Sequence, residues 1–298
     1  MYFLDKRVRV ICDELKRLRV KQRFVVSNWE YKEGNFIRPK EAEEEGTDWK
    51  AFDSQTMHWY GKDRHYWFRT TYQVPKELDG VRMWLHVCTQ IDEWDDAQNP
   101  QFLLFVNGEV VQGIDMNHRD VLLRSQAEAG EELALDLQAY TGTLHKEFHL
   151  IVEIQEIDEK IERLYYDLWT PLAAFSRMEE DDRNRKEIQE ILNTAVNFLD
   201  LRTPYSEEFY RTVSEATDYL AQALYTEKAG YRDVIATCIG HTHIDVAWWW
   251  TVAQTREKVC RSFATVLKLM EEYPNYKFMS SQPQLYVFLK ERYPELYQ

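Results

Sequence analysis

The chain has 298 residues, of which 44% are hydrophobic and 14% aromatic, so it can bury a sizeable core and is not intrinsically disordered. Lys and Arg number 37 and Asp and Glu number 51, which gives a net charge of −14. Because this charge repels phosphate backbones and anionic lipids, we expect neither nucleic acid nor a membrane as a partner. The sequence has no apolar signal segment, and its four scattered cysteines lack CxxC spacing, so we predict a cytoplasmic protein with reduced thiols.

The first 158 residues predict a short helix followed by strands. Apolar residues at helical spacing indicate a helix over 6–20, within an N-terminal segment 1–24. Strand patterns follow with almost no helix between them, at 66–74, 81–87, 102–106, 109–112 and 148–155. Asn107-Gly108 joins two of these strands and supplies the two residues with positive φ that a type I′ turn requires. We therefore predict an antiparallel β-sandwich over 25–158, with the acidic run 41–45 as a solvated loop.

The next segment, 159–230, changes to the helical period. One apolar stripe begins at Ile188 and a second at Phe209, and Thr203-Pro204 separates them. Ser206, followed by two glutamates, is a favourable start for the second helix. We predict that these helices form a connector, which packs on itself or on a neighbouring domain.

The last segment, 231–298, predicts the beginning of an α/β barrel. A short, apolar, β-branched run at 234–239 indicates a strand that is buried on both faces. A helix over 257–272, a strand over 277–281 and a helix over 284–297 follow it. The predicted fold is therefore multidomain: an antiparallel β-sandwich, a helical connector and the first βαβα units of a barrel. Two barrel strands alone would leave unpaired edges and bare apolar helix faces, so we expect the chain to be the N-terminal part of a longer enzyme.

Three polar side chains follow the predicted strand at 234–239. Alternate residues of an extended chain share a face, so His241, His243 and Asp245 are expected on one side of the strand. That side lies at the carboxyl end of a parallel strand, where α/β proteins hold their active sites. Two of these side chains can reach one ion through bonds of about 2 Å, and imidazole with carboxylate suits Zn²⁺. The alternative is a pair of structural histidines, with Asp245 capping the next helix.

Three consecutive tryptophans, Trp248 to Trp250, come directly after this cluster. Neighbouring residues of a helix or strand point in different directions, so the three cannot all enter one core, and we expect at least one in the cleft. Indole faces stack on the C–H faces of sugar rings, so a tryptophan beside a metal that binds hydroxyl groups suggests a carbohydrate ligand. Packing of all three side chains is the alternative.

These residues belong to a longer pattern that resembles a known family. The pattern consists of Gly-His-Thr-His-Ile-Asp-Val-Ala-Trp at 240–248, Gln-Thr-Arg-Glu-Lys-Val at 254–259, Met-Glu-Glu-Tyr-Pro at 270–274 and Phe-Met-Ser-Ser-Gln-Pro-Gln-Leu-Tyr at 278–286. It is similar to the start of the catalytic domain of family 38 glycoside hydrolases, from about Asp233 to the last residue. Residues 1–230 resemble, less closely, the N-terminal region of the cytosolic branch of that family, mainly at 99–109 and 113–119.

The resemblance implies a zinc-dependent retaining α-mannosidase that acts on mannose-containing glycans, with an α/β-barrel catalytic domain. The family's zinc-binding His-x-Asp pair falls on His243 and Asp245, and its sugar-contacting aromatic residue falls on Trp248. His241 is not a ligand in the family pattern, so it is expected to support the pair. The resemblance also implies that the zinc ion bridges the 2- and 3-hydroxyls of mannose while two carboxylates perform a double displacement.

Part of the family's catalytic set has no counterpart in the sequence. The nucleophilic Asp (itself a zinc ligand), the remaining His ligand and the general acid/base come from later strands in the family, and no Asp or His follows Asp245 here. We therefore expect two of the four zinc ligands, no catalytic residue within 1–298, and no mannosidase activity from these residues alone.

Two other functions are compatible with the residues. His-x-His at the end of a first strand also opens the sites of other metal-dependent hydrolases, in which both His241 and His243 would be ligands. The second alternative is a non-catalytic glycan-binding protein or a degenerate relative, for which Trp59, Trp67 or Trp94 would be the exposed aromatic candidates, although packing in the sandwich is the favoured interpretation of these residues.

One further polar cluster lies at 113–119 and includes Asp115, His118 and Arg119. We expect it to form a hydrogen-bonded loop, and the alternative is an interface with the barrel or with a second subunit. The sequence is compatible with a homo-oligomer.

Overall fold

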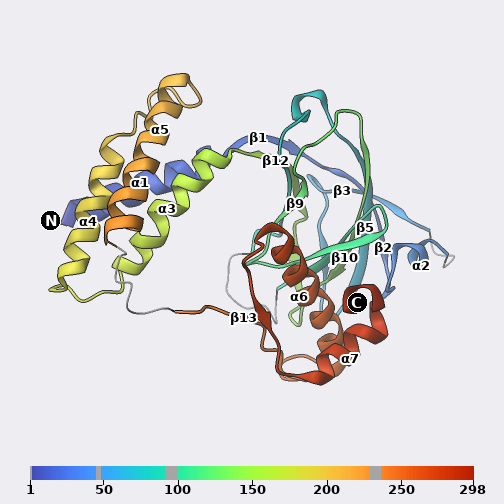
Figure 1. The fold of residues 1–298 in the computed structure, drawn as a ribbon. Coiled ribbons are helices and arrows are strands. Elements are labelled where there is room, and N and C mark those ends of the chain that lie inside the picture. Colours follow the sequence, from blue (N-terminus) through green and yellow to red (C-terminus); the bar gives the residue numbers. More distant parts are fainter. Residues whose placement is uncertain (1, 45–47, 92–98, 229–235) are drawn as a thin grey trace. The chain divides into compact units, whose positions relative to one another are not determined.

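The computed structural model describes residues 2–44, 48–91, 99–228 and 236–298 (Figure 1). The chain forms two compact units, one made of Met1–Gln22 with Glu156–Ala236 and the other of Arg23–Gln155 with Thr237–Gln298. The first unit is helical, and the second combines antiparallel sheets with helices. No helix in the described ranges has the length and apolar character needed to cross a bilayer.

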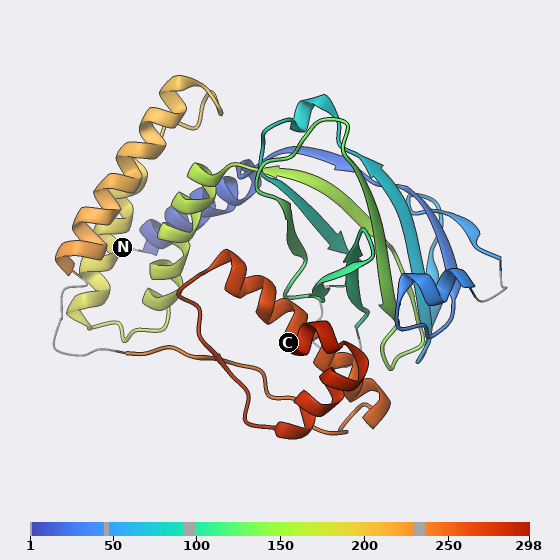
Figure 2. The ribbon, with the colours of Figure 1, turned by 45° about the vertical axis from the view of Figure 1, so that its right-hand side comes forward.

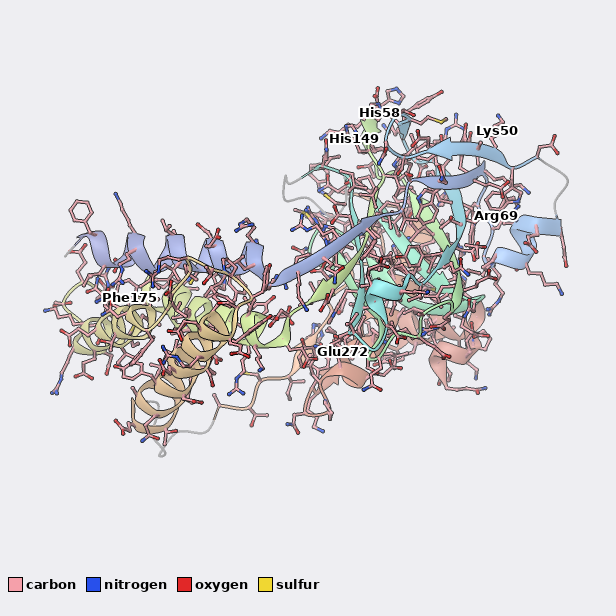
Figure 3. All side chains as sticks on the ribbon, turned by 90° about the horizontal axis from the view of Figure 1, so that it is seen from above. Lys50, His58, Arg69, His149, Phe175 and Glu272 are labelled. Carbon is pink, nitrogen blue, oxygen red and sulfur yellow. The ribbon has the colours of Figure 1, made fainter. Side chains whose placement is uncertain are left out.

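The helical unit is built around one apolar core. Its helices are α1 (Tyr2–Leu18), α3 (Glu159–Phe175), α4 (Arg183–Asn197), α5 (Glu207–Leu220) and the π-helix η2 (Ala221–Lys228). The predicted apolar stripes of α1, α4 and α5 are buried together, with Phe175 of α3 among them (Figure 3). The predicted start at Ser206 is confirmed, because its hydroxyl caps α5 by accepting the amide hydrogen of Phe209 at 3.2 Å. The N-terminal helix and the connector helices thus share a core.

Two sheets form the β-rich unit. The larger is antiparallel, in the order β3 (Lys50–Asp53), β2 (Asn28–Glu33), β5 (His65–Gln73), β10 (Glu132–Tyr140), β7 (Gln101–Val106) and β8 (Glu109–Ile114). The smaller has the order β1 (Val20–Val25), β12 (Ile151–Ile157), β6 (Met83–Cys88) and β9 (Asp120–Arg124). A short ribbon joins β4 (Trp59–Gly61) to β11 (Lys146–Phe148), and a single 3₁₀ turn, η1 (Lys76–Leu78), follows β5.

The two sheets enclose a core of alternate side chains, such as Phe68 and Leu104 from the larger sheet and Leu85 and Val152 from the smaller one. His58 and His149 pack against each other at one end of this arrangement, with ring centroids 4.2 Å apart (Figure 3). The predicted β-rich domain is therefore confirmed. The predicted turn is also confirmed, because Asn107 and Gly108 have φ values of 53° and 84°.

The acidic run at 41–45 differs from the predicted loop. Residues up to Glu44 belong to a helix, α2 (Pro39–Glu44), while Glu45 lies outside the described residues. Pro39 fits the first turn of a helix, and Ala42 is fully buried beneath it. Glu43 contacts Arg69 at 3.2 Å, so part of the charge is paired.

The C-terminal segment contains one parallel βαβ unit followed by two helices. β13 (Gly240–His241) pairs in parallel with β14 (Phe278–Met279), and α6 (Val252–Glu272) connects them. α7 (Pro283–Arg292) and α8 (Pro294–Tyr297) complete the segment, so the single helix predicted over 284–297 is divided in two before Pro294.

The strand predicted at 234–239 is displaced. Residues 234 and 235 lie outside the described residues, 236–239 have no regular structure, and the strand begins at Gly240. Ile239 is 53% exposed, which contradicts the prediction of a strand buried on both faces. The physical reason is that β14, only two residues long, is the sole pairing partner within the described ranges, so no sheet surrounds this run.

The apolar faces of the C-terminal helices are not bare, contrary to the prediction from the sequence. α6 and α7 pack against the outer face of the larger sheet (Figures 1 and 2). Trp67 of β5 and Phe105 of β7 point to this side, where they meet Val259, Leu285 and other apolar side chains of the two helices. All six residues of β7 are buried, since one face of the strand lies in the sandwich core and the other lies under these helices. Burial of each large side chain contributes roughly 1.5–3 kcal/mol, so this packing fixes α6 on the sheet.

Candidate functional site

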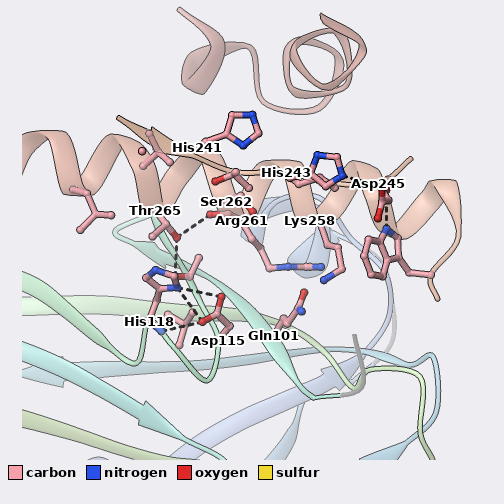
Figure 4. Close-up of a pocket in the computed structure, with 18 of the residues that line it drawn as sticks. Gln101, Asp115, His118, His241, His243, Asp245, Lys258, Arg261, Ser262 and Thr265 are labelled. Carbon is pink, nitrogen blue, oxygen red and sulfur yellow. Dashed lines mark hydrogen bonds and ion pairs between the residues drawn. The ribbon is translucent and has the colours of Figure 1, made fainter. Parts of the chain in front are cut away.

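A pocket of about 760 Å³ lies within the β-rich unit (Figure 4). Its walls are the segment 240–250, one face of α6 and the turn that follows β8. The pocket therefore brings together the predicted site residues and the polar cluster at 113–119, which are more than a hundred residues apart in sequence. It is large enough for a sugar ring and its substituents.

His243 and Asp245 face each other on one side of the pocket (Figure 4). Nε2 of His243 lies 3.0 Å from Oδ1 of Asp245, and both side chains are about half exposed or more, at 66% and 49%. The ring of His241 stacks beside that of His243 with a centroid distance of 6.4 Å. The extended backbone thus places the three side chains together, as the alternation of the sequence predicts.

The pair has the chemistry and spacing of two ligands of one zinc ion. Two ligand atoms bound tetrahedrally through bonds of about 2 Å are roughly 3.3 Å apart, close to the separation of Nε2 and Oδ1. No group of three or more His, Cys, Asp or Glu able to hold a metal exists in the described part of the chain. His243 and Asp245 therefore fit two of the four ligand positions of a zinc site.

The alternative role of Asp245 as a helix cap is wrong. The hydroxyl of Thr251 caps α6 by accepting the amide hydrogen of Gln254 at 3.3 Å. Asp245 instead presents its backbone carbonyl to Nε1 of Trp250 at 3.2 Å, which leaves its carboxylate directed toward His243. The polar side chain is thus available to the pocket.

The three tryptophans line the pocket and do not pack as a core. Trp248 and Trp249 are 69% and 61% exposed, so at least one indole faces the cleft, as predicted. The backbone turns sharply before them, since Ala247 has a φ of 71° and its amide donates to the hydroxyl of Thr255 at 3.2 Å. Exposed indole faces beside a carboxylate and an imidazole provide a stacking surface for a sugar ring.

The opposite wall is the turn after β8. Asp115 accepts hydrogen bonds from the amides of Asn117 and His118 at 2.8 and 2.9 Å, and its Oδ1 lies 3.0 Å from Nδ1 of His118. Burial would raise the pKa of Asp115, but the hydrogen bond and charge of His118 outweigh it and hold that pKa below its usual value. The cluster therefore forms a hydrogen-bonded loop, as predicted, and this loop contacts α6, because the Thr265 hydroxyl donates to the Gly113 carbonyl at 3.1 Å.

Several lining residues were not singled out in the sequence. Lys258, Arg261, Ser262 and Thr265 come from one face of α6, and Gln101 comes from β7. Nζ of Lys258 lies 4.6 Å from the centre of the Trp250 ring, which is a cation–π arrangement. The i, i+3, i+4 and i+7 spacing of the α6 residues is the signal that could have identified this polar face.

The aromatic residues proposed for a glycan-binding sandwich do not form an exposed surface. Trp59 is 2% exposed and Trp67 is fully buried, so both are core residues, in keeping with the favoured interpretation. Trp94 lies outside the described residues.

Comparison of the sequence with known proteins finds a match to a family model and matches to individual relatives. The family model described as glycosyl hydrolases family 38 N-terminal domain matches residues 233–298. Alpha-mannosidase G of Dictyostelium discoideum is 24% identical over 78% of this chain and 22% of its own length, and alpha-mannosidase 2C1 of Homo sapiens is 27% identical over the same shares of the two chains. The chain thus spans about a fifth of the length of these curated relatives.

Among solved structures, the β-D-glucuronidase of Dictyoglomus thermophilum is similar over 47% of this chain and 28% of its own, with 9% identity and a TM-score of 0.30. A likeness of this size does not assign a fold. The sequence matches cover both the site segment and much of the preceding chain. Residues 233–298 therefore match the N-terminal domain of glycosyl hydrolase family 38, and the chain is similar to part of two α-mannosidases.

Proposed function

We propose that the chain is the N-terminal part of a zinc-dependent, retaining α-mannosidase that hydrolyses mannose-containing glycans in the cytoplasm. The observation that carries the proposal is the 3.0 Å approach of His243 Nε2 to Asp245 Oδ1 at the wall of a pocket that also presents Trp248. The curated relatives named above are α-mannosidases, and the family match covers these residues.

In this proposal His243 and Asp245 hold the zinc ion, which when bound supplies Lewis acidity toward the sugar hydroxyls. Trp248 provides a flat apolar surface for one face of the mannose ring. His241 stacks beside His243 and restricts the orientation of its ring.

The β13–α6–β14 unit is proposed as the first βαβ unit of an α/β barrel. The nucleophile, the acid/base and two further zinc ligands would then come from other strands of that barrel. Residues 1–298 alone are expected to have no mannosidase activity, so the test has to measure metal binding.

The experiment is a zinc titration of the chain followed by NMR of the histidine side chains. Zinc is expected to shift the ring ¹⁵N resonances of His243, weakly and with one-to-one stoichiometry, because only two ligands are present. His243→Ala and Asp245→Ala should abolish this shift, whereas His241→Ala should retain it.

The same titration separates the alternatives. If His241→Ala abolishes the shift as completely as His243→Ala, both histidines are ligands and another class of metal-dependent hydrolase is favoured. If zinc leaves His243 unaffected in the parent chain, the zinc proposal fails. Turnover of an aryl α-mannoside by the chain, if lost in His243→Ala, would show that the expected inactivity is wrong.

A further inference from the structure

A second cluster of reactive side chains lies on the smaller sheet, outside the proposed zinc pair. His86 and Cys88 are two residues apart on β6, so they share the face that points away from the sandwich core, while Leu85 and Val87 point inward. Asp120 of β9 is the register partner of His86. Nδ1 of His86 lies 2.6 Å from Oδ1 of Asp120, which orients the ring and leaves its other nitrogen for a second partner.

The thiol of Cys88 is surrounded by hydrogen-bond donors. It lies on the same face of β6 as the His86 ring, it accepts the amide hydrogen of Gln90 at 3.3 Å, and Nη1 of Arg119 lies 3.6 Å from its sulfur. An imidazole held by a carboxylate, a backbone amide and a guanidinium all stabilise the thiolate over the neutral thiol. The arrangement is that of a nucleophile, a base and an orienting acid, built from two adjacent strands.

The direction of the pKa values agrees with this geometry. The hydrogen bond from His86, together with the Gln90 amide and the charge of Arg119, outweighs burial and lowers the pKa of Cys88. Burial would lower the pKa of His86, but the hydrogen bonds to Asp120 and Cys88 raise it to about 9. Both shifts favour the form of the pair in which Cys88 is a thiolate and His86 an imidazolium.

A small cavity of about 10 Å³ adjoins this cluster. Cys88 and Arg119 contribute to its lining, together with Thr89, Asn99 and Asp115. Its volume is that of about one water molecule, so a peptide or a sugar ring does not fit inside it. The cavity therefore favours a very small polar reactant.

The other three cysteines lack either the partial exposure of Cys88 or its hydrogen-bonding partners. Cys12 and Cys260 are buried, and burial raises the pKa of each to about 12. Cys238 is exposed, and no hydrogen bond to its thiol occurs among the described residues. Cys88 combines partial exposure with a set of stabilising partners.

We propose that Cys88, with His86, Asp120 and Arg119, is a peroxide-reactive site that hydrogen peroxide converts to a sulfenic acid. The thiolate sulfur attacks one peroxide oxygen, so an S–O bond forms as the O–O bond breaks. The sulfur loses two electrons, and the peroxide gains them. The displaced hydroxide takes a proton from the His86 imidazolium and leaves as water. Arg119 holds negative charge at the reacting sulfur, and Asp120 is a positioning residue that acts through His86.

The test uses the chain with all four cysteines present. The chain is treated with hydrogen peroxide at a series of pH values, sulfenic acid is trapped with dimedone, and the labelled peptides are quantified by mass spectrometry. At pH 7 we expect Cys88 to be labelled at least about tenfold faster than Cys238, with a lower midpoint in its pH profile than the ~8.5 of an ordinary thiol. The ionisable groups that set this profile are His86, Asp120 and Arg119, with Asp115 on the wall of the cavity.

Variants identify the origin of the reactivity. His86→Gln and Asp120→Asn should move the midpoint for Cys88 toward 8.5, and Asp120→Asn keeps the size of the side chain if His86→Gln perturbs folding. His58→Gln removes a histidine that is paired with Glu147 elsewhere and should leave the profile unchanged. Equal labelling of Cys88 and Cys238, or a profile that neither His86→Gln nor Asp120→Asn moves, would overturn the proposal.

Discussion

At the scale of single residues, Glu257 on α6 is a buried charge with several charged partners. Its side chain is 4% exposed, and both carboxylate oxygens lie within 3.1 Å of Nε2 of His65 on β5. Arg261 and Arg292 lie 3.6 and 4.0 Å from the same carboxylate. Burial would raise the pKa of Glu257, but the His65 hydrogen bond and the two arginines outweigh it and lower that pKa.

The lowered pKa predicts how the stability depends on pH. A carboxyl whose pKa is lower in the folded state stabilises the fold above its unfolded pKa of about 4.3 and loses this contribution as the pH falls through the folded value. Glu257→Gln is therefore expected to cost about 3–5 kcal/mol of unfolding free energy at pH 7, because it leaves buried cations without their partner. The difference from the parent chain should narrow below about pH 4, as measured by urea unfolding at each pH.

Glu291→Gln is the matched control for this prediction. Glu291 pairs with Arg256 at 2.6 Å, but both side chains are half exposed. Such a pair contributes at most about 1 kcal/mol, so this variant should be nearly as stable as the parent at every pH. Equal losses for the two variants would show that the burial of Glu257 has no energetic consequence.

The residues of the two sites differ in how far the sequence predicts them. His241, His243 and Asp245 were predicted to share one side because they alternate along an extended segment, and the family resemblance singled out the last two as the zinc pair. The partners of Cys88 could not be predicted, since Asp120 is 34 residues from His86 and reaches it only through the pairing of β6 with β9. Local periodicity predicts which residues of one strand lie together. Residues from two strands are brought together by the register in which the strands pair, which periodicity does not give.

At the scale of secondary-structure elements, the same limit appears. Apolar stripes in the sequence predicted four helices, α1, α4, α5 and α6, because the amphipathic face of a helix is visible in its own residues. Over 236–239 the predicted strand is absent, because a strand forms only where another strand pairs with it, and the local sequence does not contain that partner. The hairpin pattern predicted the strand β7 but not the burial of both its faces, because the second face is covered by helices from a distant part of the chain.

The contact between α6 and β8 depends on Gly113. A Cβ atom at this position would lie 2.4 Å from the carbonyl oxygen and 2.7 Å from the carbonyl carbon of Arg261, both in the backbone of α6. Gly113→Ala therefore has to push the helix from the sheet, and we expect a loss of about 1–3 kcal/mol in chemical denaturation. Thr265→Val removes the hydroxyl that donates to the carbonyls of Gly113 and Arg261 without adding a close contact, and should cost about 1 kcal/mol. An unchanged denaturation midpoint for Gly113→Ala would contradict this close approach.

At the scale of the whole molecule, the sequence suggested that 25–158 and 231–298 are separate domains, whereas one compact unit contains the sheets together with residues 237–298. The apolar core beneath α6 and α7 is built from both segments, with Leu103 and Phe105 from β7 and Leu285 and Leu289 from α7. A shared core couples the stability of its two parts, because neither segment buries these side chains alone.

This coupling predicts a long-range effect of a single core substitution. Leu285 is fully buried on α7, so Leu285→Ala should cost about 2–5 kcal/mol. Since Leu285 belongs to the same core as Trp67 of β5 and Phe105 of β7, hydrogen exchange measured by mass spectrometry should show weaker protection in these strands as well as in α6 and α7. Leu168→Ala makes the same change in the core of the helical unit and controls for nonspecific effects on exchange. Loss of protection confined to the C-terminal helices would mean that the segment folds independently of the sheet, and the shared core would then have no cooperative role.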